Sequence, residues 1–195
     1  EGGTSYAMGN DVTSDLSVRR ALTYAIDRDA VIENVLSGYG KPAYSVSDDM
    51  PWSSDDMEVE LDRDLAARLL DDAGWAIGSD GVRAKDGVRA AFDIWYSSDD
   101  SARQAIANEL SNQFAQIGIE ASPRGGSWDE IYSHQYEQPV LWGWGSNSPI
   151  EVYALNYSTG WGNYACYENA AIDAHLDEAL AQRSIEDSYA YWQLA

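Results

Sequence analysis

The sequence predicts an α/β fold: a small mixed sheet with βαβ units, flanked by helices. Apolar residues recur at helical spacing in several segments. A strand, a helix and a second strand follow one another over residues 91–123, which favours two parallel strands. Two Asp-Gly turns, at 80–81 and 86–87, enclose a short stretch that fits a hairpin.

The first part of the chain predicts three helices and one long loop. Apolar residues share a helix face over 18–26, and Asp27 is placed to cap a second helix that runs to Leu36. Residues 41–60 are rich in Pro, Ser and Asp, so we expect an irregular loop there. Asp62 then caps a third helix, which a glycine closes.

The second part alternates strands with helices. The expected strands are short apolar stretches: 91–96, 119–123 and 140–144. The expected helices are 101–117, a segment capped by Ser127 and a segment capped by Asn169. This succession of elements gives the α/β prediction its order along the chain.

Composition excludes several classes of function. The 195 residues carry a net charge of −21, from 33 acidic and 12 basic side chains. Such a surface repels phosphate backbones and anionic membranes, so we expect no nucleic-acid partner. Cys166 is the one cysteine, which rules out an internal disulfide. Eight Trp and thirteen Tyr against two Phe suit a surface that binds a ligand.

Catalytic and metal sites find little support in the sequence. A nucleophilic triad needs a suitable histidine, and both histidines, His134 and His175, fall on expected helices. The aspartates within 48–56 lack the spacing of a calcium loop. We therefore expect no catalytic residue, metal site or cofactor, although 33 acids leave an acid-pair hydrolase open as an alternative.

The most informative stretch runs from Leu141 to Pro149. It lies at the C-terminal end of an expected strand of an α/β sheet, at the edge where such folds bind ligands. Trp142 and Trp144 are separated by one glycine, which would put both indoles on the same face of that strand. The alternative is that both tryptophans pack in the core of a βα turn, and the residues favour neither reading.

Several segments resemble family 5 of the solute-binding proteins of ABC importers, the oligopeptide, dipeptide and nickel binding group. Residues 18–32 resemble the family segment "VRxALxYAIDRxxII", and residues 66–75 are similar to "AxxLLxxAGW". Residues 80–87 resemble the turn "DGxRxxDG". The region of Trp144 and residues 167–180 complete the family order, so the resemblance covers nearly the whole chain.

The resemblance implies a type II periplasmic-binding-protein-like lobe without catalysis. Residues 1–195 would form a single lobe, the C-terminal ligand-binding lobe of a larger two-lobe protein truncated at both ends, and a monomer as it stands. The full-length protein would capture a peptide or peptide-like solute in the periplasm or as a cell-surface lipoprotein. It would then deliver the solute to ABC permease subunits. A nickel or other metal chelate is the second ligand class, and a relative that presents its aromatics to a protein partner is a further alternative.

The resemblance also implies where the ligand lies. Peptide binders of the family carry, three residues after the tryptophan at the Trp144 position, an aspartate that receives the amino group of the peptide. Asn147 stands there in this chain and carries no charge, so the ammonium–carboxylate pair would be missing unless Glu151 replaces it. The expected ligand-binding residues are Trp142, Trp144, Gly145, Asn147, Ser148, Glu151, Trp161 and Tyr164.

Overall fold

The computed structural model describes residues 8–144 and 148–195, and the chain divides into two compact units. The first unit comprises residues 1–42 and 59–142, and the second comprises residues 43–58 and 143–195. Each unit has its own hydrophobic core. That residues 1–195 together form one lobe of a larger protein stays a prediction.

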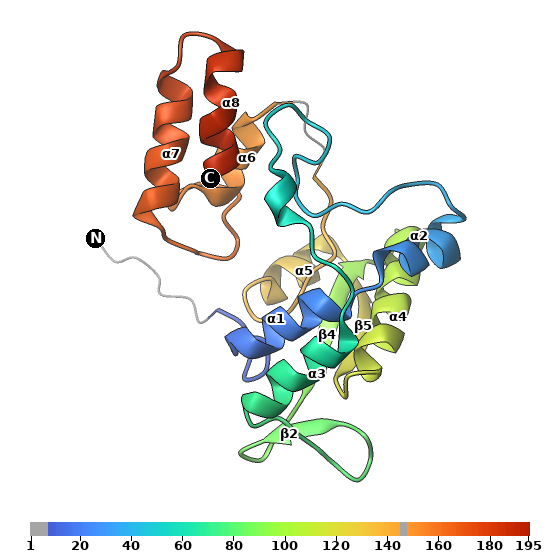
Figure 1. Cartoon of the computed structure of the whole chain (residues 1–195). Helices are drawn as coiled ribbons and strands as arrows, with labels where there is room; N and C mark the ends of the chain where they lie inside the picture. The colour runs from blue at the N-terminus through green and yellow to red at the C-terminus, as the bar shows by residue number, and fades with distance from the viewer. Residues whose placement is uncertain (1–7, 145–147) are drawn as a thin grey trace. The chain divides into compact units, whose positions relative to one another are not determined.

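Three helices of the first unit lie where the sequence predicts them. They are α1 (Leu16–Ala25), α2 (Arg28–Leu36) and α3 (Arg63–Asp72). Each begins after an aspartate whose side chain accepts a hydrogen bond from a main-chain N–H of the first turn: Asp15, Asp27 and Asp62. Helices α1 and α3 pack side by side (Figure 1). The predicted caps at Asp27 and Asp62 are confirmed.

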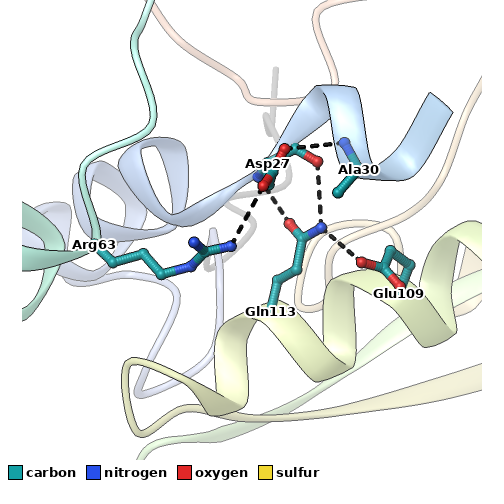
Figure 2. A network of polar contacts seen from close by, with 5 residues as sticks. All are labelled: Asp27, Ala30, Arg63, Glu109 and Gln113. Atoms are coloured by element: carbon teal, nitrogen blue, oxygen red, sulfur yellow. Dashed lines mark hydrogen bonds and ion pairs between the residues drawn. The ribbon is translucent and has the colours of Figure 1, made fainter. Parts of the chain in front are cut away.

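The corner between α1 and α2 is held against α4 (Ser101–Ala115) by a buried amide (Figure 2). Gln113 is 2% exposed and accepts a hydrogen bond from the Asp27 N–H at 2.8 Å. Its Nε2 donates to the Asp27 carbonyl at 3.2 Å and to Glu109 Oε1 at 2.9 Å. Arg63 Nη2 lies 3.8 Å from Asp27 Oδ2. Asp27 therefore joins α2, α3 and α4.

A parallel βαβ unit, β4 (Ala91–Ser97), α4 and β5 (Glu120–Gly126), forms the centre of the first unit. The register pairs Ala91 with Glu120 and continues to the end of both strands. Phe92, Ile94 and Tyr96 alternate along β4 and are all buried, as the period of a strand requires. Figure 1 shows α4 alongside the two strands. The α/β fold and the parallel pairing are confirmed.

The expected hairpin forms part of a small antiparallel sheet. Its strands are β1 (Ala76–Ile77), β2 (Arg83–Lys85) and β3 (Val88–Arg89). Asp86 and Gly87 connect β2 to β3 with φ values of 52° and 83°, a conformation that favours Asp and Gly. Strand β1 escapes prediction because two residues show no periodicity.

The strand expected over 140–144 is wrong. Val140 makes one isolated parallel bridge to Trp95, supported by hydrogen bonds from Trp95 N–H to the Pro139 carbonyl and from Leu141 N–H to the Trp95 carbonyl, both 2.8 Å. Gly143 lies three positions after Val140, and a glycine has no side chain to pack against a neighbouring strand. The pairing therefore ends after one residue.

The second unit is helical in its described residues. It contains a 3₁₀ turn η1 (Asp55–Met57) and three helices: α6 (Ile150–Asn156), α7 (Ala170–Ala181) and α8 (Ile185–Leu194). Helices α7 and α8 pack side by side (Figure 1). The cap at Asn169 is confirmed. The core consists of Trp52, Val152, Leu176, Ala179 and Trp192.

Asp15 gives the first unit a specific response to acid. Its carboxylate accepts hydrogen bonds from the Ser17 N–H at 2.8 Å, from Trp75 Nε1 at 3.0 Å and from Lys85 Nζ at 2.9 Å. Burial raises the pKa of Asp15, but these bonds outweigh it and lower the pKa from 3.8 to about 2. The Asp15 carboxyl group is therefore a stronger acid in the folded state than in the unfolded state.

A lowered pKa in the folded state stabilises the fold above the unfolded pKa. We expect the contribution of Asp15, about 2 kcal/mol, to be complete above pH ~4 and to be lost as the pH falls towards 2. Asp15→Asn should flatten this part of the curve of unfolding free energy against pH, measured by urea titration. Asp64→Asn, at an exposed acid in the first turn of α3, is the control. Equal acid sensitivity of wild type and Asp15→Asn would contradict the assignment.

Candidate functional site

The boundary between the two units divides the expected ligand-binding residues. Trp142 belongs to the first unit, whereas Trp144, Ser148, Glu151, Trp161 and Tyr164 belong to the second. Gly145 and Asn147 lie outside the described residues. The expectation that both indoles share one strand face is wrong, because residues 140–144 form no strand. Each part of the set is therefore described within its own unit.

Three rings of the second unit form an aromatic cluster, here called the Trp144 cluster: Trp144, Trp161 and Tyr164. The ring centroids of Trp144 and Trp161 lie 5.4 Å apart at an interplanar angle of 58°. Those of Trp144 and Tyr164 lie 6.3 Å apart at 34°. Tilted pairs at such distances attract through their quadrupoles. Trp161 is 70% exposed, so the cluster presents a broad indole surface to solvent.

Two glycines bring the loop that carries Trp161 close to α6. A Cβ added to Gly160 would lie 2.3 Å from the Ala154 carbonyl oxygen, and one added to Gly162 would lie 2.9 Å from Leu155 Cδ2. The Gly162 N–H donates to the Ala154 carbonyl at 3.0 Å. Only a residue without a side chain fits at Gly160, so this close approach holds the loop beside α6.

Ser148 and Glu151 lie at the beginning of α6. Ser148 is exposed, and its Oγ accepts a hydrogen bond from the Ile150 N–H at 3.4 Å. Glu151 belongs to the first turn of the helix, where a negative charge is favoured by the helix dipole. Among residues 8–144 and 148–195, its Oε2 is shielded from solvent and has no hydrogen-bond partner. Glu151 thus holds an acceptor that the described part of the chain does not use.

Trp142 packs against two aromatic residues that the sequence reasoning missed. Its ring centroid lies 5.2 Å from that of Trp128 and 5.7 Å from that of Tyr132. Both partners belong to α5 (Trp128–His134), which begins with a capping box formed by Ser127 and Glu130. Trp128 and Tyr132 are four positions apart and therefore share a helix face, a signal that was available in the sequence.

His134 packs as a structural residue. Its ring stacks on Trp95 with centroids 4.5 Å apart and an interplanar angle of 17°. Over residues 8–144 and 148–195, no three His, Cys, Asp or Glu side chains gather as metal ligands would. Within the same residues, every helix is too short or too polar to cross a membrane.

Known proteins are similar to this chain in sequence. The family described as bacterial extracellular solute-binding proteins, family 5 middle, matches residues 3–165. Protein XP55 of Streptomyces lividans is 41% identical over 175 residues, which cover 85% of this chain and 32% of XP55. The oligopeptide-binding protein AppA of Bacillus subtilis is 29% identical over 197 residues, which cover 93% of this chain and 35% of AppA.

A solved structure shares the fold. NikZ of Campylobacter jejuni, in complex with Ni(L-His), is 26% identical and superposes with a TM-score of 0.83, covering 95% of this chain and 40% of NikZ. This likeness confirms the expected type II periplasmic-binding-protein fold. The chain spans about a third of the length of the curated relatives it matches. Because the family pattern extends over most of its residues, the chain belongs to family 5 of the bacterial extracellular solute-binding proteins.

Proposed function

We propose that the chain is the ligand-binding lobe of a solute receptor of an ABC importer. The receptor captures a peptide or peptide-like solute outside the membrane and delivers it to the permease. It does so either in the periplasm or as a lipoprotein held at the cell surface. The observation that carries this proposal is the Trp144 cluster, with an indole that is 70% exposed. Membership of a family of binding proteins supports a role without catalysis.

The chemistry of the second unit suits a peptide. Indole and phenol rings stack on apolar side chains and on flat peptide groups, and their faces attract cations. Glu151 Oε2 has no hydrogen-bond partner among the residues that the structure describes, and a shielded acceptor without a donor costs free energy. A ligand ammonium beside Glu151 would offset that cost. In peptide binders of the family, an aspartate at the position of Asn147 receives the amino group of the peptide. We assign this role to Glu151.

A metal chelate is the second candidate ligand. The likeness to NikZ, whose structure contains Ni(L-His), favours it. The described residues offer no cluster of metal ligands, so such a chelate would be held through its organic part, stacked on the aromatic rings. An acid-pair hydrolase remains the alternative from another class. Turnover of a peptide or glycoside that is abolished by one Asp or Glu substitution would favour the hydrolase.

The 195-residue chain should bind its ligand weakly, because we propose that it is one lobe of a two-lobe receptor and a monomer. A lobe that forms only half of a cleft makes only half of the contacts to the ligand, and it leaves most of the ligand surface in water. Calorimetric titration of the chain with a nonapeptide mixture is therefore expected to show no binding at micromolar concentration. Micromolar or tighter binding would contradict the two-lobe proposal.

Trp161 provides the direct test of the site in the full-length receptor. We expect Trp161→Ala to weaken binding of a nonapeptide mixture, or of Ni(L-His), by at least about tenfold. An indole that a bound ligand covers is a typical binding hot spot. The control is Tyr39→Ala, which removes a ring that is 85% exposed in the first unit. Calorimetry measures both variants. Unchanged affinity in Trp161→Ala would exclude the Trp144 cluster from the ligand site.

A further inference from the structure

The loop between α6 and α7, residues 157–169, carries two rings of the Trp144 cluster. Trp161 and Tyr164 both belong to it, whereas Trp144 precedes α6. A loop without a helix or strand keeps a fixed shape only where its polar groups find partners. The positions of the Trp161 and Tyr164 rings therefore depend on the hydrogen bonds that hold the loop backbone.

The Asn163 side chain joins the beginning of this loop to its end. Its Nδ2 donates to the carbonyls of Tyr157 at 3.2 Å, Ser158 at 3.4 Å and Tyr167 at 2.8 Å. Its Oδ1 accepts a hydrogen bond from the Tyr167 N–H at 3.2 Å. A single amide thus uses its donors and its acceptor to hold loop backbone on both sides.

The flanks of the loop are tied to both neighbouring helices. The Ser158 N–H donates to Asp173 Oδ1 of α7 at 2.8 Å, and the Asn169 N–H donates to Ser158 Oγ at 3.1 Å. The Gly162 N–H donates to the Ala154 carbonyl of α6 at 3.0 Å. The two rings lie between these anchors. Within that interval, the Asn163 side chain bridges the two ends of the loop.

We propose that Asn163 is a positioning residue of the ligand site. It acts through the loop backbone, without touching the ligand, and sets the angle and distance of Trp161 and Tyr164 relative to Trp144. The selectivity of the site for flat or apolar ligand groups then depends on an amide outside the rings. The step from ring geometry to ligand binding rests on the proposed function, whereas the ring geometry can be measured without any ligand.

Circular dichroism tests the geometric step on the chain itself. Two indoles 5.4 Å apart couple excitonically, and the difference spectrum between wild type and Trp161→Phe isolates the band of this pair. Asn163→Asp keeps the size and the acceptor but removes the Nδ2 donors. We expect the band to be lost at neutral pH and to return in part on acidification, because the protonated carboxyl regains one donor.

The matched control is Asn156→Asp, which adds the same charge to the second unit. Asn156 Nδ2 donates to the Val152 carbonyl within α6 at 3.0 Å, so the band should remain. Should Asn163→Asp lose its helical signal, Asn163→Leu, which keeps the size but has neither donor nor acceptor, is read in its place without the acid step. A band that persists in the folded Asn163 variant would overturn the proposal. So would a loss in folded Asn163→Asp that acidification does not reverse.

Calorimetry of the full-length receptor with a nonapeptide mixture separates this inference from the proposed function. Both hold if wild type binds and both Trp161→Ala and Asn163→Asp bind about tenfold more weakly. If wild type binds and only Trp161→Ala is weakened, the positioning role of Asn163 fails. If Trp161→Ala binds as wild type does, the proposed site fails, while the spectroscopic result still decides the role of Asn163 in ring geometry.

Discussion

Replacing Arg83 by methionine is expected to lower the free energy of unfolding of the first unit by about 3 kcal/mol. Arg83 belongs to β2 and is only 4% exposed. Its Nε donates to the Ile117 carbonyl at 2.8 Å, and its Nη1 donates to the Trp75 carbonyl and to Asp71 Oδ1, both at 2.5 Å. Methionine fills a similar volume but leaves two buried carbonyls without donors, and each costs about 1–2 kcal/mol.

The control separates the carbonyls from the ion pair. The Asp71 side chain is 61% exposed, so Asp71→Asn should cost less than about 1 kcal/mol, as exposed ion pairs do. Urea titration followed by circular dichroism measures both variants, and hydrogen exchange of β4 and β5 reports on the first unit. If Asp71→Asn were as destabilising as Arg83→Met, the ion pair would be the stabilising contact.

Replacing Gln113 by leucine should cost the first unit about 2 kcal/mol. The change leaves the Asp27 N–H without a partner at a half-buried corner between α1 and α2 (Figure 2), and it leaves the Asp27 carbonyl with the Val31 N–H as its remaining donor. The leucine side chain is of similar size to that of glutamine, so lost packing contributes little. Urea titration and hydrogen exchange of α2 measure the effect, which should appear first as faster exchange in that helix.

The companion variant Gln113→Glu gives the test a pH dependence. Above its pKa the new carboxylate accepts from the Asp27 N–H but cannot donate, and it lies beside Glu109. Below its pKa the neutral acid regains a donor. Stability relative to wild type should therefore recover as the pH falls. A cost for Gln113→Glu that is independent of pH, or a Gln113→Leu variant as stable as wild type, would contradict the role assigned to the amide.

The sequence could predict the elements whose signals are local. Asp27, Asp62 and Asn169 each stand directly before a segment with apolar residues at helical spacing, and each caps the helix that follows. The alternation along β4 and the helix after it predicted the βαβ unit. Strand β1 and helix α6 escaped prediction because they are short, and α6 begins after Pro149 without a side-chain cap. Neither has a periodicity long enough to read.

The candidate site depended on packing that spacing does not encode. Trp142 and Trp144 are two positions apart, yet they belong to different units: Trp142 packs on Trp128 and Tyr132, and Trp144 packs on Trp161 and Tyr164. The family resemblance put Trp161 and Tyr164 among the expected ligand-binding residues, but it did not predict that their rings contact Trp144. No pattern pointed to Asn163, because its partners are main-chain groups brought together only when the loop closes.

Mass spectrometry of the solute that copurifies with the full-length receptor tests the central claim most directly. The receptor is purified without denaturation, and the solute is then released by unfolding and identified. We predict a peptide or peptide-like solute in wild type, and its absence from a variant that combines Trp144→Ala with Trp161→Ala. No small molecule in wild type, or the same solute at equal occupancy in the variant, would contradict the account.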